Sequence, residues 1–196
     1  MAFWKDGDAQ PKRNFRFKVE IAGSTWWWAK TCDTPSFDVG EVEVNYLDNK
    51  FYYPGRVSWN EVNMSVVDPI SEDVTSKVSA FLESMNYIIK GTTAVNGTIS
   101  KVAAVRGAIP PLGVESQGTG GTTVVITIFD AGSAGDGKTG AAVEKWTLNN
   151  AWLKSAKFGT LDYSNDELKQ VDLVWRYDWA TLDDTSGTDK FVPQAS

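Results

Sequence analysis

Histidine is absent from this chain of 196 residues, and cysteine occurs only once. Without histidine the chain lacks the side chain that most often moves protons near neutral pH and that most often binds metals. A Ser-His-Asp or Cys-His catalytic site is therefore excluded. Cys32 has no partner for an internal disulfide, so folding needs no oxidising compartment and fits synthesis in a cytoplasm. Close to three tryptophans, its thiol is expected to be a small buried hydrophobe, not a nucleophile.

Basic charge is also scarce, with 19 Lys and Arg against 25 Asp and Glu, a net charge of -6 and a pI near 4.7. Strong binding to nucleic acid rests on Lys and Arg that neutralise phosphates, so a protein that grips DNA or RNA is not expected. No stretch reaches the ~18 consecutive apolar residues of a membrane span, and the first residues lack a signal-peptide pattern. We expect neither a membrane anchor nor export by a secretory signal.

The remaining chemical motifs are weak. Asp162 and Asp166, or Glu41 and Glu43, could flank a glycosidase cleft, but alternate acidic residues on a strand are more often solvated charges. The Gly-rich segment 130–137 lacks the spacing and final Glu of a calcium loop, and segment 118–121 lacks the Lys of a phosphate-binding loop. We therefore expect no enzymatic activity, no cofactor and no metal.

What the chain has in abundance is aromatic residues and alternating strands. Nine Trp, six Tyr and nine Phe favour sheets and interfaces over a small helical bundle. Alternation predicts a strand at 15–21, paired with 26–32 through a short turn at 22–25. Further strands are predicted at 41–46, 57–68, 124–129, 143–148, 151–158 and 171–179. The polar tail from Thr181 is expected to be mobile.

Two of these strands lie on either side of a predicted turn at Tyr53-Pro54-Gly55-Arg56, and each has one polar and one apolar face. The polar faces are formed by Glu41, Glu43, Asn45, Glu61, Asn63 and Ser65. The apolar faces are formed by Val42, Val44, Tyr46, Val62, Met64 and Val66.

One helix is predicted after Asp68-Pro69, with Asp68 as its cap and Glu72 and Asp73 complementing its dipole. Its apolar stripe is formed by Val74, Val78, Phe81, Leu82, Met85, Ile88 and Ile89. Gly91 is the expected end of the helix. The following segment, 92–122, exceeds the ~12 to 15 residues usual for a loop, so it is either flexible or ordered by a neighbour.

These elements predict a single, mainly β domain over residues 1–196 with one α-helix. Its architecture is an antiparallel β-sandwich or partly closed β-barrel with a flanking helix and long loops. Five tryptophans in strands are expected in the core, namely Trp59, Trp146, Trp152, Trp175 and Trp179. Exposed tryptophans on a sandwich also stack on sugar rings, so a monomeric carbohydrate-binding module is an alternative.

Four stretches, 15–21, 34–69, the helix and 161–179, resemble in pattern and order the tail tube proteins of large contractile-tailed bacteriophages. That group is related to the tube proteins of type VI secretion systems. The resemblance implies a structural virion protein that is made in the host cytoplasm and forms hexameric rings. The rings stack into a tail tube inside a contractile sheath, between baseplate and tail terminator proteins. DNA would pass through during ejection without specific binding.

Two related alternatives share this fold: the tube of a secretion or injection particle that moves protein cargo, and a tube-like baseplate or terminator protein. We assign the six polar-face residues, Glu41, Glu43, Asn45, Glu61, Asn63 and Ser65, to the lumen, where charge of one sign would let DNA slide. Their other interpretation is an ordinary outer surface. Assembly contacts are assigned to Trp4, Trp26, Trp27, Trp28, Tyr53, Pro54, Gly55, Arg56, Pro110 and Pro111.

Overall fold

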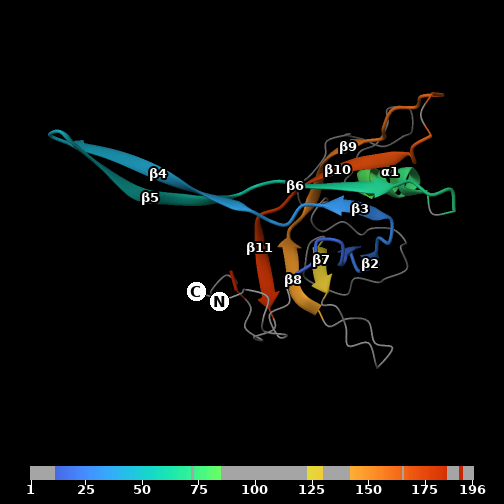
Figure 1. The fold of residues 1–196 in the computed structure, drawn as a ribbon, viewed down its shortest axis with the longest axis horizontal. Helices are drawn as coiled ribbons and strands as arrows, with labels where there is room; N and C mark the ends of the chain where they lie inside the picture. The colour runs from blue at the N-terminus through green and yellow to red at the C-terminus, as the bar shows by residue number, and fades with distance from the viewer. Residues whose placement is uncertain are drawn as a thin grey trace, which may run out of the picture.

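The computed structural model describes residues 12–71, 73–84, 123–129, 142–164, 166–184 and 190–191. These residues form eleven strands and one helix, more strands than the sequence predicts (Figure 1). All strand pairs are antiparallel, and the described strands form three open sheets with no closed barrel. The prediction of a mainly β protein with a flanking helix is confirmed, in its β-sandwich form.

Two sheets make the sandwich. The five-stranded sheet has the order β11 (Trp179–Asp184), β8 (Ala142–Asn149), β7 (Val124–Phe129), β1 (Phe17–Ile21) and β2 (Ser24–Thr25). The four-stranded sheet has the order β3 (Ala29–Cys32), β6 (Val62–Val67), β10 (Gln170–Arg176) and β9 (Trp152–Lys157). The predicted strands at 15–21, 124–129, 143–148 and 151–158 are therefore confirmed within two residues at each end.

The core lies between these sheets, because alternate residues of each strand point inward. The largest buried side chains are Trp175, Ile21, Met64, Ile126, Leu148 and Leu173. Of the five tryptophans expected in the core, only Trp175 is fully buried, at 2% exposed. Trp59, Trp146 and Trp152 are half-buried against the core, and Trp179 is half-buried at the start of β11.

The predicted hairpin of 15–21 with 26–32 is wrong. β1 pairs instead with the short β2 and with β7, while β3 pairs with β6 in the other sheet. Ala22 and Gly23 have positive φ values of 50° and 78°, so the chain turns immediately after Ile21. It then crosses from one sheet to the other at Trp26–Trp28, which lie in this connection and not in a strand.

The predicted turn at Tyr53–Arg56 is also wrong, because these residues lie inside β5 (Asn49–Trp59). β5 pairs with β4 (Phe37–Tyr46) in a long two-stranded ribbon that projects from the body (Figure 1). The true turn is Leu47-Asp48, with φ 54° at Leu47. Proline is tolerated within β5 because a two-stranded ribbon leaves one side of each strand without hydrogen-bond partners.

The helix α1 (Val74–Ser84) begins five residues after Pro69, later than predicted. Its cap is Asp73, whose Oδ1 accepts a hydrogen bond from the Ser76 amide at 3.1 Å. Asp68 still contributes, because its Oδ1 accepts from the Val74 amide at 2.9 Å. The predicted stripe is confirmed at Val74, Val78 and Phe81, which are buried, and at Leu82, which is half-buried. The stripe residues Met85, Ile88 and Ile89, together with Glu72 and Gly91, lie outside the described residues.

The prediction of a mobile tail from Thr181 is wrong for the tail residues that the structure describes. Residues 179–184 form β11, which pairs with β8 over its whole length. Lys190 then exchanges two backbone hydrogen bonds with Leu182, of 2.8 and 3.1 Å, so the chain returns alongside β11. The predicted long segment 92–122 and the connection 131–140 lie outside the described residues.

Candidate functional site: assembly surfaces

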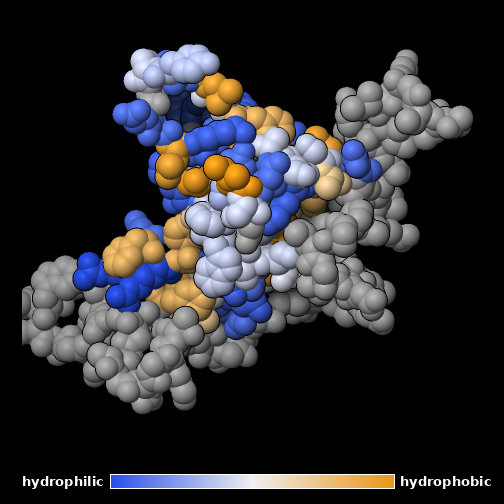
Figure 2. All heavy atoms as spheres, turned by 90° about the vertical axis from the view of Figure 1, so that its right-hand side faces the viewer, coloured by the Kyte–Doolittle hydropathy of each residue, from blue (hydrophilic) through white to orange (hydrophobic). Residues whose placement is uncertain are grey.

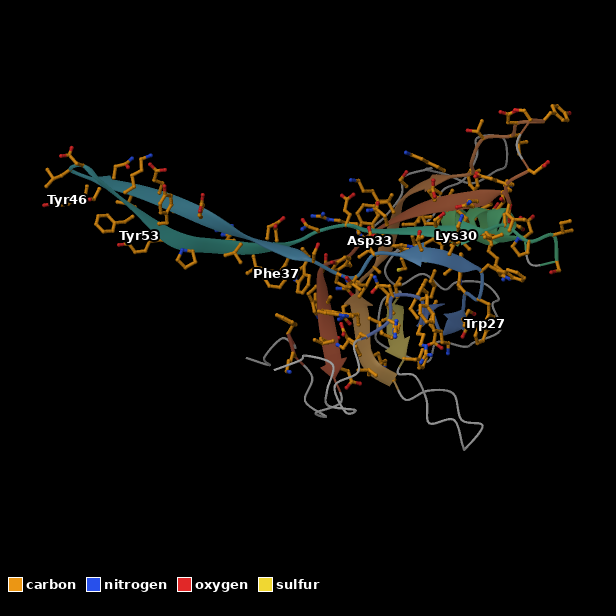
Figure 3. The ribbon with its side chains drawn as sticks, in the orientation of Figure 1. Trp27, Lys30, Asp33, Phe37, Tyr46 and Tyr53 are labelled. Atoms are coloured by element: carbon orange, nitrogen blue, oxygen red, sulfur yellow. The ribbon has the colours of Figure 1, made fainter. Side chains whose placement is uncertain are left out.

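A row of exposed apolar side chains lies on the distal half of the β4–β5 ribbon. Cross-strand pairs join Val42 to Tyr53 and Val44 to Phe51. These four side chains and Tyr46 are between 45% and 67% exposed. Figure 3 shows Tyr46 near the tip, Tyr53 along the ribbon and Phe37 at its base. The face predicted to be dry is thus uncovered in the single subunit, although the alternation itself was predicted correctly.

A β-bulge separates this distal half from the base of the ribbon. Between the pairs Val39–Val57 and Glu41–Pro54, the register advances two residues in β4 and three in β5. Odd-numbered positions of β4 are apolar before the bulge and even-numbered positions after it. Because β4 alternates, the base and distal apolar pairs lie on opposite faces of the ladder. The distal pairs therefore do not continue the surface that packs on the subunit's own core.

The base of the ribbon is held by an aromatic cluster. Phe37 meets Trp59 edge to face at 5.4 Å between ring centroids, and Trp59 lies 6.0 Å from Tyr177. Phe191, supplied by the returning tail, contacts Phe37 at 5.9 Å and stacks on Trp146 at 6.3 Å. Such contacts contribute roughly 0.5–1.5 kcal/mol each beyond area burial. They anchor the ribbon to the sandwich at one end only.

The six residues assigned to the lumen lie on two different sheets. Glu41, Glu43 and Asn45 are on the exposed polar face of the ribbon, where Glu43 pairs with Lys50 at 2.8 Å. Asn63 and Ser65 point away from the core on β6, and Glu61 directly precedes that strand. The sequence predicted both polar faces, but it could not show that they belong to separate sheets.

The outer face of the four-stranded sheet is polar and carries both signs of charge. Glu61 pairs with Lys154 and, at 3.5 Å, with Arg176. Asn63 donates to Asp33 at 2.9 Å, and Ser65 donates to Gln170 at 3.2 Å. Asp172 and Lys157 are cross-strand neighbours on the same face. This face is therefore hydrated and nearly charge-balanced, and it lacks the single acidic sign expected for a lumen.

The same sheet ends in two strands whose outer edges have no partner among the described residues. These are β3 on one side and β9 on the other. An unpaired edge presents a row of backbone N–H and C=O groups to which a strand of another chain can add. The two edges differ, so a contact of β3 with the β9 of another copy would be head-to-tail and would leave a further edge free for the next copy.

A second group of exposed apolar side chains lies at the opposite end of the molecule, on the connection between β9 and β10. Leu161, Tyr163 and Leu168 are exposed there, and so is Ile70 from the connection before α1. Figure 2 looks onto this end and shows apolar groups interspersed with polar ones. The sequence interpretation missed this surface, because isolated apolar residues in a polar turn segment have no periodicity to reveal them.

The assembly residues predicted outside the ribbon have mixed outcomes. Trp27 is 75% exposed and lies over the Lys18 ammonium at 5.9 Å, whereas Trp26 is packed against the core. The tryptophans Trp26–Trp28 thus divide between the core and the surface. Trp4, Pro110 and Pro111 lie outside the described residues.

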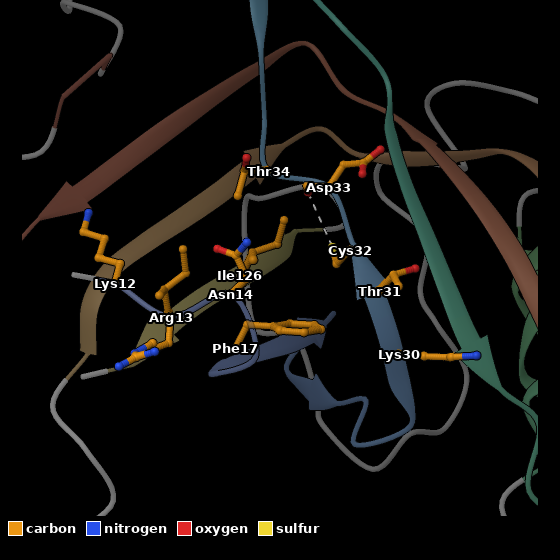
Figure 4. Close-up of a pocket in the computed structure, with 11 residues that line it drawn as sticks. Lys12, Arg13, Asn14, Phe17, Lys30, Thr31, Cys32, Asp33, Thr34 and Ile126 are labelled. Carbon is orange, nitrogen blue, oxygen red and sulfur yellow. Dashed lines mark hydrogen bonds between the residues drawn. The ribbon is translucent and has the colours of Figure 1, made fainter. Parts of the chain in front are cut away.

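A cavity of about 420 Å³ lies between β1, β3 and β7 (Figure 4). Phe17 and Ile126 form part of its lining, with Lys12 and Arg13 on one side and Cys32 on the other. Cys32, predicted to be a small buried hydrophobe, is half-buried against the core, and burial raises the pKa of its thiol to about 12. Among the described residues no cluster of three or more His, Cys, Asp or Glu could hold a metal. No helix of the described chain is long and apolar enough to cross a membrane.

Comparison with known proteins identifies the fold. No family model and no curated protein matches the sequence. Among solved structures, one described as the tube-terminating cap of the anti-feeding prophage matches with TM-score 0.60 and 15% identity, over 94% of this chain and 100% of that chain. A sheath/tube terminator of an extracellular contractile injection system matches with TM-score 0.57 and 10% identity, over 89% of this chain and 97% of that chain. The sheath–tube complex of such a system matches with TM-score 0.56 and 11% identity, over 91% and 95%. The chain has the fold of the tube and tube-terminator proteins of contractile injection systems, as its sequence pattern implied.

Proposed function

We propose that this protein is a structural, non-enzymatic subunit of the tube of a contractile tail or tail-like injection particle. Copies close into rings, and the rings stack into a hollow conduit. The observation that carries this proposal is the β4–β5 ribbon, whose distal apolar face is exposed and turned away from the subunit's own core. A surface of this kind marks an interaction site. The fold shared with tube proteins supports another copy of this chain as the partner.

Ring closure would use the four-stranded sheet. Pairing of β3 in one copy with β9 in the next continues the sheet from subunit to subunit without leaving a free edge. Six copies of four strands would give a barrel of about 24 strands, wide enough for a water-filled bore. Its polar outer face, with Glu61, Asn63 and Ser65, would line that bore. Glu41, Glu43 and Asn45 would extend the polar wall where the ribbon reaches the next ring.

The proposed partners are further copies, a contractile sheath, and baseplate and terminator proteins. In a phage tail the conduit would carry DNA during ejection, and the protein would be located in the virion. In an injection particle the conduit would carry protein cargo. Ion pairs such as Glu61 with Lys154 leave the sheet face close to neutral, so neither cargo would be held tightly.

A terminator protein is the second candidate. It is favoured by the match to the tube-terminating cap, which covers 94% of this chain and all of that one. A tube subunit adds rings without limit, whereas a terminator stops at one ring because one of its ring faces does not accept another. Light scattering of the purified protein separates the two, since the weight-average mass that it reports rises with concentration only when rings stack.

Native mass spectrometry tests ring formation itself. The proposal predicts a closed species of about 129 kDa, six times the 21.5 kDa subunit. A monomer at every concentration would contradict the proposal and favour the carbohydrate-binding alternative. A surface variant outside the proposed contacts, Lys145→Asp on the outer face of the five-stranded sheet, should assemble as the unmodified protein does.

A further inference from the structure

The structure points to a specific receptor for the distal ribbon: we infer that it docks on the β9–β10 end of the next copy. This receptor surface is formed by Leu161, Tyr163 and Leu168 of the β9–β10 connection and by Ile70. The inference rests on the proposed tube and adds the surface through which successive rings hold one another.

The receptor surface is unusually exposed for a single subunit. Its four members are between 71% and 111% exposed, above every member of the ribbon's distal face. Burial of apolar area stabilises, so two leucines, an isoleucine and a tyrosine that stay in water forgo that contribution. An apolar partner would recover that free energy.

This surface is held in shape, as a docking site requires. Asp162 accepts hydrogen bonds from the Ser164 amide at 2.9 Å and from its hydroxyl at 2.7 Å, which closes a turn beside Tyr163. Lys169 ties the connection to the segment before α1, through its ion pair with Asp68 at 2.6 Å and a backbone bond of 3.0 Å. These contacts keep Ile70 beside the end of the β9–β10 connection.

The positions of the two surfaces suit linear growth. The ribbon and the β9–β10 connection lie at opposite ends of the longest axis of the molecule (Figure 1). A contact between two different patches is heterologous, so each added copy presents the same free patch to the next copy. Two patches at opposite ends direct this growth along one line, as stacking of rings requires.

The charges beside the two surfaces are complementary. Arg56 is exposed at the bulge beside the distal apolar face. Asp162 and Asp166 are exposed within the β9–β10 connection. An arginine facing carboxylates at the rim of an apolar contact sets the register of docking and excludes other orientations. The cavity beside Cys32 is a less suitable docking site for the ribbon, because Lys12 on the rim of that cavity already forms an ion pair with Glu144.

Cross-linking of engineered cysteines tests the docking directly. Tyr53→Cys protein, mixed with Tyr163→Cys protein and oxidised, should give a disulfide-linked dimer. A chain that carries both substitutions should give a ladder of higher multimers. All of these chains carry Cys32→Ser, so that the half-buried native thiol cannot take part. Tyr53→Cys mixed with Arg13→Cys, on the cavity rim, is the matched control and should stay monomeric on a denaturing gel.

The outcomes separate this inference from the proposed function. If unmodified protein forms neither rings nor tubes, the proposed function fails and the inference with it. If tubes form without the Tyr53–Tyr163 cross-link, or with the Arg13 cross-link in its place, only the docking inference is wrong.

A charge exchange provides an independent test. Arg56→Glu and Asp166→Arg should each raise the protein concentration needed for tube growth about two- to fivefold, the range of a rim ion pair. The combined variant should return toward the unmodified value, while Asp183→Arg, on β11, should have no effect. A combined variant as impaired as the two single variants together would overturn the docking register.

Discussion

The bulge in the ribbon allows a sharp prediction, because its two glycines differ in the space around them. A Cβ added at Gly55 would lie 2.9 Å from the Gly40 carbonyl oxygen and 3.1 Å from the Gly40 carbonyl carbon. A Cβ added at Gly40 would meet nothing closer than 3.5 Å. Gly55→Ala therefore forces the two backbones apart by about half an ångström, whereas Gly40→Ala needs no movement. Overpacking of this kind costs about 1–3 kcal/mol.

That cost falls on a two-stranded ladder, which by itself is only marginally stable. We expect Gly55→Ala to open the pairs beyond the bulge while the sandwich, which does not depend on them, keeps its melting temperature within about 2 °C. Hydrogen exchange of the amides in 41–46 should become faster, and tube growth should be lost. Gly40→Ala should behave as the unmodified protein in all three assays. Equal effects of the two substitutions, or tube growth by Gly55→Ala at the normal concentration, would refute the reasoning.

The remaining predictions concern assembly, the helix cap and the thiol. Val44→Asp should abolish tube growth without lowering the melting temperature by more than a few degrees, because Val44 lies opposite Phe51 on the ribbon and is not part of the core; a large loss of thermal stability would count against this. Asp68→Asn should destabilise the fold by about 0.5–2 kcal/mol at pH 7, because the neutral amide cannot form the ion pair with Lys169. The bond from Lys169 lowers the pKa of the Asp68 carboxyl, so its stabilising effect is present above the unfolded pKa, near 3.8, and is lost as pH falls through the folded value. Thermal melts should therefore converge for both proteins at low pH. Native Cys32 should resist thiol reagents at pH 7 and react once the chain is unfolded in denaturant, and rapid labelling of the folded protein would contradict its burial.

The sequence predicted those elements whose side chains are buried within one subunit. β6 alternates because Val62, Met64 and Val66 face the core while Asn63 faces water, so its pattern and its environment agree. β4 has an equally regular pattern, yet Val42 and Val44 are exposed. Alternation indicates that one face of a strand will be buried. It does not indicate whether the residues that bury this face belong to the same chain.

The wrong predictions arose where the same local sequence signal occurs in two different structures. Pro-Gly is typical of turns, but at Pro54-Gly55 it marks a bulge, which tolerates the missing amide and brings Gly55 against Gly40. The true turn at Leu47-Asp48 lacks the glycine that usually reveals a hairpin. The polar composition of β11 gives no clear alternating pattern, so the sequence did not predict this strand. Its structure depends on pairing with β8 and not on a burial pattern of its own.

Electron microscopy of the purified protein tests the central claim most directly, because assembly into a hollow tube needs neither sheath nor cargo. The account predicts stacked rings with a central bore at neutral pH, and separate, unstacked rings for Val44→Asp under the same conditions. Micrographs that show only separate subunits of the unmodified protein at high concentration, or filaments without a bore, would contradict it.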